Sequence, residues 1–198
     1  MLVTSDVTAV ARLLLSRPGC VCAYPTETFY GLGSRIDDAA ALNRIIVAKG
    51  RDALKGMIVL VTDMAMAAGL AVMDDRQKAF LARLWPAPVS AVLQAARALD
   101  PLLAPDGRVA LRVSPHRMAT ELVQQVGPVT STSANRTGEP PARTAGEAAG
   151  QDLDIDAILD GGRTPGGKPS TLVDLTVWPP VCLREGAVPF QEILDLSF

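Results

Sequence analysis

The chain has 198 residues and a formal net charge of -2, and 48% of its residues are hydrophobic while only 4% are aromatic. This length suits one ordinary domain, and that apolar content can fill an aliphatic core without disulfides or a structural metal. Proteins that bind long stretches of nucleic acid usually carry an excess of basic residues, which the chain as a whole lacks. A local basic groove is still compatible with this total.

The N-terminus lacks the basic segment, apolar core and cleavage site of a signal peptide, and no apolar run approaches the ~20 residues that span a bilayer. We therefore expect a cytoplasmic protein. Cys20 and Cys22 would lie on one side of a strand, and with Cys182 they are expected to be reduced thiols. Because His116 is the only histidine, a zinc site would lack ligands; His116 itself is expected to start a helix or lie on the surface.

In chain order, Asp6 can cap a first helix that ends at Pro18, and Asp37 or Asp38 can cap a second. Further helices are predicted near residues 74–84 and 117–125 from their apolar spacing. Buried strands are predicted at residues 20–24, 57–61, 89–93, 109–113, 129–131, 157–159, 171–175 and 181–184.

Strands that alternate with helices favour the α/β class. The spacing is irregular and some strands follow one another directly, so we expect a mixed sheet. The Gly/Pro-rich segment 161–169 is predicted to be a loop inside one domain that covers residues 1–198, because too little chain follows it to build a second.

Segment 24–33, with the sequence YPTETFYGLG, leaves a buried strand and is predicted to end in a Gly-x-Gly turn. Thr26, Glu27 and Thr28 stand between aromatic residues in a loop that Pro25 stiffens, an arrangement that suits a small polar ligand. An ordinary loop, with Thr and Glu capping the next turn, is the alternative.

Three cations, Lys49, Arg51 and Lys55, fall within seven residues that include Gly50. Lysine supplies a mobile point charge and arginine a rigid fork, so the group could clamp a polyphosphate. The alternative is a helix C-terminus whose cations complement the helix dipole.

Segment 131–138, STSANRTG, follows a predicted strand, and its hydroxyls and backbone N–H groups could hold an anion; a plain Ser/Thr/Asn-rich turn, which is more common, is the alternative. Segments 171–174 and 184–186 are two further polar edges. Other signatures fail: Pro169 follows Lys168 where a P-loop needs Ser or Thr, and Gly31-x-Gly33 lacks the third glycine of a dinucleotide fingerprint.

Together these segments resemble the YrdC/TsaC-type threonylcarbamoyl-AMP synthase family, in its short, single-domain bacterial form. The similarity extends from the first strand to Gly186. The shared segments occur in the order YPTETFYGLG, KGR followed by KG, ALRV, STSAN, PSTLVDLT and REGA. Each segment is short, but the set of six in this order makes a chance match hard to sustain.

The resemblance implies a twisted mixed sheet flanked by helices, with an open groove that has a positive lining. It also implies an L-threonylcarbamoyladenylate synthase, a nucleotidyltransferase that forms threonylcarbamoyl-AMP and pyrophosphate from L-threonine, bicarbonate and ATP. A partner complex then transfers the threonylcarbamoyl group to tRNA, and weak binding of tRNA by this chain is compatible with that role. Fixed cations and N–H donors would stabilise the charge that develops on the phosphates.

Site residues follow from the resemblance, position by position. Catalysis is assigned to Lys49 and Arg51. ATP contacts are assigned to Lys49, Arg51, Ser133, Asn135, Thr171 and Arg184, and threonine contacts to Thr26, Arg112 and the backbone of Ser131. Mg²⁺ is expected on the ATP phosphates, with few protein ligands and several waters.

The chain departs from the family in places. Asp52 and Ala53 stand where many relatives have proline, and Leu60 stands where some have a polar contact to threonine. The chain also ends soon after Arg184, so we expect no extra C-terminal domain. Two alternatives stay open: a non-catalytic RNA-binding module on the same fold, and a paralogous carbamoyl-transfer enzyme.

Overall fold

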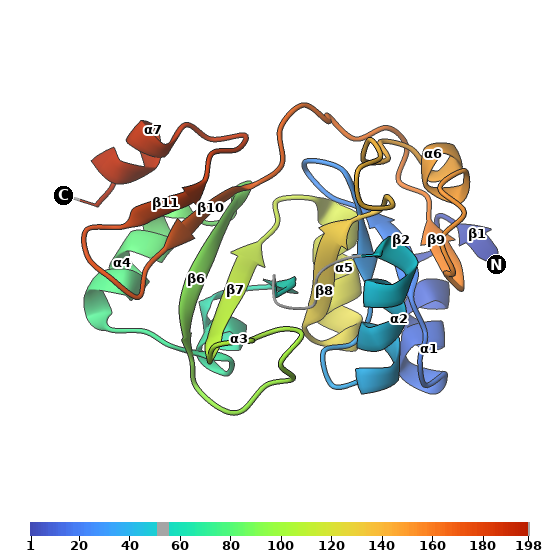
Figure 1. The fold of residues 1–198 in the computed structure, drawn as a ribbon, viewed down its shortest axis with the longest axis horizontal. Coiled ribbons are helices and arrows are strands. Elements are labelled where there is room, and N and C mark those ends of the chain that lie inside the picture. Colours follow the sequence, from blue (N-terminus) through green and yellow to red (C-terminus); the bar gives the residue numbers. More distant parts are fainter. Residues whose placement is uncertain (51–55, 198) are drawn as a thin grey trace.

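The computed structural model describes residues 1–50 and 56–197. Within these ranges, eleven strands form one hydrogen-bonded sheet (Figure 1). Its order is β1-β9-β2-β3-β8-β4-β7-β6-β10-β11, and β5 pairs with β6 outside this path. The strands are β1 (Leu2–Thr4), β2 (Cys22–Pro25), β3 (Tyr30–Gly33), β4 (Ile58–Val61), β5 (Ala71–Val72), β6 (Val89–Ala95), β7 (Arg108–Val113), β8 (Val129–Ser133), β9 (Ala157–Leu159), β10 (Thr171–Asp174) and β11 (Val181–Arg184).

The sheet is mixed, as predicted. The pairs β1–β9, β9–β2, β4–β7 and β6–β10 are parallel, and the remaining pairs are antiparallel. Parallel neighbours need a crossover connection, and the helices supply most of these. The helices are α1 (Val7–Ser16), α2 (Ala39–Lys49), α3 (Met64–Ala68), α4 (Asp75–Leu84), α5 (Arg117–Val126), α6 (Ala145–Ala149) and α7 (Phe190–Asp195).

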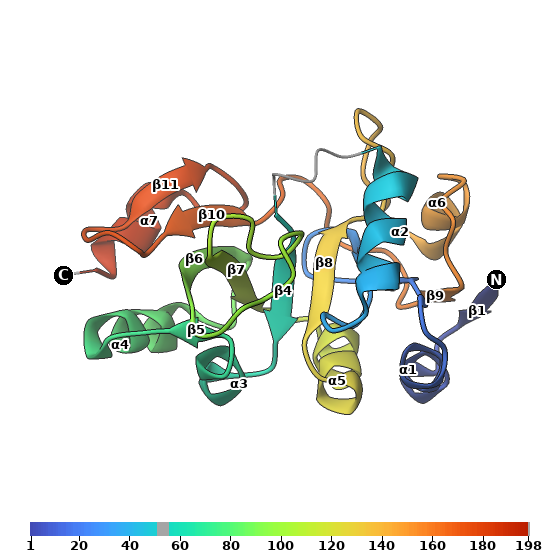
Figure 2. The same cartoon turned by 60° about the horizontal axis from the view of Figure 1, so that its bottom comes forward.

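Helices cover both faces of the half of the sheet that contains β9, β2, β3 and β8 (Figure 2). Apolar side chains of α1 and α5 form one buried cluster with β2, β8 and β9. Those of α2 and α6 belong to the larger cluster on the opposite face. Each face of this half is therefore closed by a helix pair, and α/β layering follows from burial of both sheet faces.

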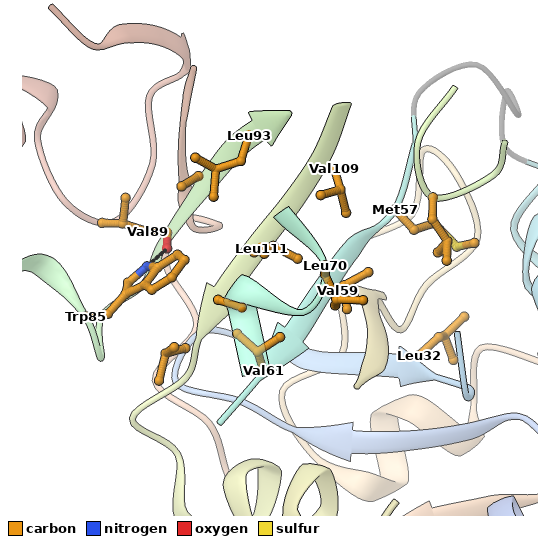
Figure 3. Close-up of a cluster of buried hydrophobic side chains, with 14 of the residues drawn as sticks. Leu32, Met57, Val59, Val61, Leu70, Trp85, Val89, Leu93, Val109 and Leu111 are labelled. Atoms are coloured by element: carbon orange, nitrogen blue, oxygen red, sulfur yellow. Dashed lines mark hydrogen bonds between the residues drawn. The ribbon is translucent and has the colours of Figure 1, made fainter. Parts of the chain in front are cut away.

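The other half of the sheet has its own apolar packing. Strands β4, β6 and β7 contribute Val59, Leu93, Val109 and Leu111 to a buried group (Figure 3). The indole Nε1 of Trp85 donates to the backbone oxygen of Val89 at 2.8 Å, so the ring can be buried without an unsatisfied donor.

The helix predictions made from caps are confirmed. Asp6 accepts hydrogen bonds from the first turn of α1, and Asp38, rather than Asp37, caps α2. Asp74 and Gln77 form a complete capping box on α4. His116 is the N-cap residue of α5, although its side chain makes no capping bond.

The predicted Gly-x-Gly turn in segment 24–33 is wrong, because Tyr30–Gly33 form strand β3, antiparallel to β2 and β8. A Cβ at Gly33 would collide with the ring of Tyr24 on the neighbouring strand. The glycine therefore marks a close approach between side chain and backbone, not a reversal of the chain.

The elements that prediction missed are short. β1, β5, α3, α6 and α7 contain two to six residues each, too few to show a period in the sequence. The predictions made for Arg51, Asp52, Ala53 and Lys55 fall outside the residues that the structure describes. In the described ranges, no helix has the length and apolar character needed to cross a membrane.

Candidate functional site

A cavity of about 130 Å³ opens near the middle of the sheet, where its two halves meet. The hairpin loop between β2 and β3, the strands β4, β7 and β8, and the approach to β10 all reach it. Its lining residues are Thr26, Thr28, Phe29, Tyr30, Gly31, Ile58, Arg112, Ser131, Thr132, Ser133, Pro169, Ser170 and Arg184. Hydroxyl groups and two guanidinium groups thus surround a small space.

The hairpin loop 26–29 is held by its own hydrogen bonds. The amide of Thr26 donates to the backbone oxygen of Phe29 at 3.2 Å, and its hydroxyl donates to the same oxygen at 2.7 Å. The hydroxyls of Thr26 and Thr28 lie 3.2 Å apart. Both threonines are buried, so the loop presents two ordered hydroxyls to the cavity.

Arg112 lies at the C-terminal part of β7, and only 4% of its side chain is exposed. Its Nη2 donates to the hydroxyl of Ser131 on β8 at 3.2 Å. Its Nε lies 3.4 Å from Oε1 of Glu27, whose other oxygen accepts from the hydroxyl of Ser114. A buried cation is therefore present in the cavity wall with one carboxylate beside it.

Strand β8 reaches the cavity because β3 leaves room for it. Gly31 pairs with Ser133, and a Cβ at Gly31 would lie 3.3 Å from the hydroxyl oxygen of Ser131. A larger residue would press on that hydroxyl and its bond to Arg112. The small residue at position 31 thus helps to keep Ser131 in place.

Lys49 ends helix α2 and is 5% exposed. Its ammonium donates to the backbone oxygen of Ser133, and to the backbone oxygen of Asn135 at 2.8 Å. The amide of Thr137 in turn donates to the backbone oxygen of Lys49 at 2.9 Å. Lys49 therefore holds the end of β8 and the residues that follow it, and it does not itself line the cavity.

Arg184 and Ser170 form the opposite wall. Nη2 of Arg184 donates to the backbone oxygen of Ser170 at 2.8 Å. Gly186 follows closely, and a Cβ there would collide with backbone atoms of Pro169 and Thr171. This contact explains the glycine in the REGA segment, since β11 and the start of β10 approach too closely for any side chain.

The predicted loop 161–169 crosses from β9 to β10 along the top of the view in Figure 1. Tyr30, a cavity residue, donates its hydroxyl to the backbone oxygen of Gly162 at 2.8 Å. Arg143 donates to the backbone oxygen of Pro165 at 2.8 Å. The loop is therefore tethered to the β3 side of the sheet before it enters β10.

The structure gathers five of the predicted site residues around the cavity. These are Thr26, Ser131, Arg112, Ser133 and Arg184. Lys49 and Asn135 do not line the cavity, but Lys49 donates to the backbone oxygens of both Ser133, which does, and Asn135. Thr28 was predicted only as one of three polar side chains in a loop that suits a small ligand, and no role was assigned to Tyr30 or Ser170, although all three line the cavity.

Two residues lie elsewhere. Thr171 is fully buried, and its hydroxyl donates to the backbone oxygen of Val188, so it does not line the cavity. Leu60 is 1% exposed and belongs to the apolar cluster beneath α1 and α5. Arg51 is outside the described residues.

The fold and site define an α/β protein with a polar, arginine-lined cavity in the middle of a mixed sheet. A family model described as "Telomere recombination", for Sua5, YciO and YrdC, matches residues 15–186. The chain belongs to this Sua5/YciO/YrdC family.

Relatives and solved structures agree with that membership. The threonylcarbamoyl-AMP synthase of Chromohalobacter salexigens is 40% identical over 175 residues, which is 87% of this chain and 94% of that protein. That of Pyrococcus abyssi is 38% identical over 182 residues, and the match spans 89% of this chain but only 53% of that protein.

A crystal structure of P. abyssi Sua5 complexed with L-threonine superposes with a TM-score of 0.90 at 32% identity, over 99% of this chain and 60% of that one. Escherichia coli YciO shares the fold, with a TM-score of 0.84 at 24% identity over 98% of both chains.

Proposed function

We propose that the chain is an L-threonylcarbamoyl-AMP synthase, a nucleotidyltransferase that uses L-threonine, bicarbonate and ATP and releases pyrophosphate. Family membership supports this function, as do the names of its relatives and the threonine complex of P. abyssi Sua5. The observation that carries it in this chain is Arg112, a buried cation in the wall of a hydroxyl-lined cavity.

In this proposal Arg112 binds the threonine carboxylate, and the hydroxyls of Thr26 and Ser131 complete the subsite. Threonine would bind there as a zwitterion and react with bicarbonate to give its carbamate and water. A carbamate oxygen would then attack the α-phosphorus of ATP, and pyrophosphate would leave. Ser133 and Arg184 lie on the same cavity, where N–H and O–H donors can stabilise the phosphate oxygens. We keep the prediction that ATP is also contacted by Lys49, Asn135, Thr171 and Arg51.

The groups around the cavity suit phosphate oxygens better than a bare cation, because hydroxyls and guanidinium groups dominate the lining. In the described part of the chain, no three His, Cys, Asp or Glu side chains cluster as metal ligands. We therefore propose that Mg²⁺ arrives on the triphosphate, neutralises its charge there, and takes its remaining ligands from water. A tRNA threonylcarbamoyl-transfer complex would use the product in the cytoplasm.

The test is release of pyrophosphate in ATP, Mg²⁺ and bicarbonate, with and without L-threonine, and with chromatographic identification of threonylcarbamoyl-AMP. Threonine-dependent release is expected, and Arg112→Ala should raise the KM for threonine ~100-fold, since a charge-assisted hydrogen-bonded pair is lost. Absence of any threonine-dependent product would overturn the proposal. RNA binding without turnover would instead support a binding module, and turnover with another acyl acceptor would support a carbamoyl-transfer paralogue.

A further inference from the structure

Glu27 occupies an unusual place beside the cavity. It stands between Thr26 and Thr28, which both line the cavity, whereas Glu27 itself does not. Only 10% of its side chain is exposed, and its carboxylate meets Arg112 and the hydroxyl of Ser114. An acidic side chain next to the cation that would bind a substrate carboxylate needs an explanation, because it opposes the charge that attracts the ligand.

The physical reason begins with burial. A guanidinium that is 4% exposed has lost most of its hydration, and without a counter-charge it would strongly destabilise the fold. Among the described residues, Arg112 contacts the hydroxyl of Ser131 through Nη2 and has the carboxylate of Glu27 3.4 Å from Nε. The contact with Glu27 is an ion pair, since neither Nε nor Oε1 has a hydrogen-bond partner in the described part of the chain, and it supplies the counter-charge that offsets the cost of burying Arg112.

Ser114 extends this arrangement to helix α5. Its hydroxyl donates to Glu27 and accepts from the amide of His116, the N-cap residue, at 3.1 Å. A chain of contacts thus runs from the start of α5 through Ser114 and Glu27 to Arg112. Each link is buried or partly buried, so the position of the guanidinium is set by the fold before any ligand arrives.

We propose that Glu27 is a positioning residue for the amino-acid substrate: it orients Arg112 and cancels its charge, so that the subsite accepts a zwitterion and rejects phosphate. This inference rests on the proposed function, because it takes the Arg112 subsite as the threonine site. With Glu27 ionised, the pair is neutral, and a polyanion such as the triphosphate gains little there. Without the negative charge of Glu27, Arg112 would attract any anion.

The kinetic test compares Glu27→Gln, which keeps the shape and removes the charge, with Glu27→Ala and with Glu27→Asp. Glu121→Gln is the matched control, since Glu121 pairs with Arg117 within the outer surface of α5. Glu27→Gln should raise the KM for threonine about tenfold while kcat and the KM for ATP stay within about twofold, as expected for loss of one charged contact. Inorganic phosphate should become a competitive inhibitor against threonine. Glu27→Asp should restore part of the affinity.

The proposal would be overturned if neither the KM for threonine nor inhibition by phosphate changed in Glu27→Gln. A lower kcat with an unchanged KM for threonine would overturn it as well. Ser114→Ala, which removes one hydrogen bond to the carboxylate, provides a milder variant if Glu27→Gln unfolds; about a threefold rise in the KM for threonine is expected. Failure of the wild type to make any threonine-dependent product would instead refute the proposed function.

A second readout needs no turnover. His116 is the only histidine, so its NMR signal is unambiguous. Burial lowers the pKa of His116, and the negative charge of Glu27 raises it. Glu27→Gln should therefore lower the pKa of His116 further, while Glu121→Gln should leave it unchanged. An unchanged pKa in Glu27→Gln would mean that Glu27 carries no charge in the folded protein, which would overturn the charge-cancelling role.

Discussion

At the scale of single residues, the polar side chains that matter most are buried beside polar partners. Lys49, Arg112 and Asn135 are each less than one-tenth exposed; Lys49 donates to Asn135, and Arg112 donates to Ser131. Such groups are stable inside a protein only when partners satisfy them. Removal of one partner therefore leaves the others uncompensated, and the effect should reach beyond the residue that is changed.

Lys49→Ala should abolish turnover and destabilise the protein by about 2 kcal/mol, because the backbone oxygens of Ser133 and Asn135 lose a charged donor. The measurements are pyrophosphate release and the urea midpoint of unfolding. Lys78→Ala serves as control, since Lys78 is half exposed and, among the described residues, makes a long ion pair with Asp75 alone. Wild-type turnover in Lys49→Ala would remove Lys49 from the site.

The cysteines should differ sharply in reactivity. Cys20 and Cys22 are buried, and burial is the main cause that raises the pKa of Cys20 to about 11. Cys182 is partly exposed. A thiol reagent at pH 8 should label one cysteine in the native protein and all three in denaturant. Native Cys182→Ser should not react; rapid labelling of that variant would mean that β2 opens readily.

At the scale of elements, one carboxylate joins three pieces of the α1/α2 half. Asp156, just before β9, accepts from the amide of Val21 at 3.0 Å and forms ion pairs with Arg44 of α2 and Arg17 after α1. Its side chain is 8% exposed. Burial disfavours the charge of Asp156, but these donors outweigh burial and lower its pKa.

Asp156→Asn should destabilise the protein by about 2 kcal/mol at pH 7, because two cations lose their counter-charge. The pKa of Asp156 is lower in the folded than in the unfolded protein. The stabilisation by its carboxylate is therefore complete above pH ~4 and is lost as pH falls through the folded pKa. Urea unfolding at several pH values tests this, and the difference from wild type should shrink in acid.

Asp154→Asn is the matched control, since Asp154 pairs with the same Arg44 but is 77% exposed. Asp154→Asn should lower the free energy of unfolding by at most ~0.5 kcal/mol, as expected for an exposed ion pair. Equal costs for the two variants would contradict a special role for Asp156.

At the scale of the whole molecule, the cavity is built from both halves of the sheet. Thr26 and Ser133 come from the β2, β3 and β8 side, whereas Arg184 and Ser170 come from the β10 and β11 side. A ligand that contacts both sides should join them, so its binding should be visible in the stability of the whole fold.

Saturating L-threonine and MgATP should raise the melting temperature. A ligand at 100 times its Kd adds ~2.7 kcal/mol, which corresponds to about 5–10 °C for a chain of this size. Differential scanning calorimetry measures the shift, and D-threonine is the control. Equal shifts with both enantiomers would argue against a specific amino-acid site.

The sequence alone determined the features that depend on near neighbours in the chain. The cap candidates Asp6 and Asp38 predicted where two helices begin, and an unbroken apolar run predicted β4, because these signals act within a few residues. The order of polar segments also led to the family. The short elements and strand β3 were not predicted. Two glycines close together suggest a turn, and only the ring of Tyr24 packed against them explains why glycine stands in a strand here.

Only the tertiary structure decided which polar groups meet. Strand order brings β3 beside β8 and β7 beside β4, and that order places Ser131 against Arg112 and Glu27 behind it. The fold also brings the ammonium of Lys49 to the backbone oxygen of Ser133, and it buries Thr171 outside the cavity lining. Contacts between residues far apart in the chain depend on how strands pair across the whole sheet, and local sequence patterns do not fix the pairing of strands that are not consecutive.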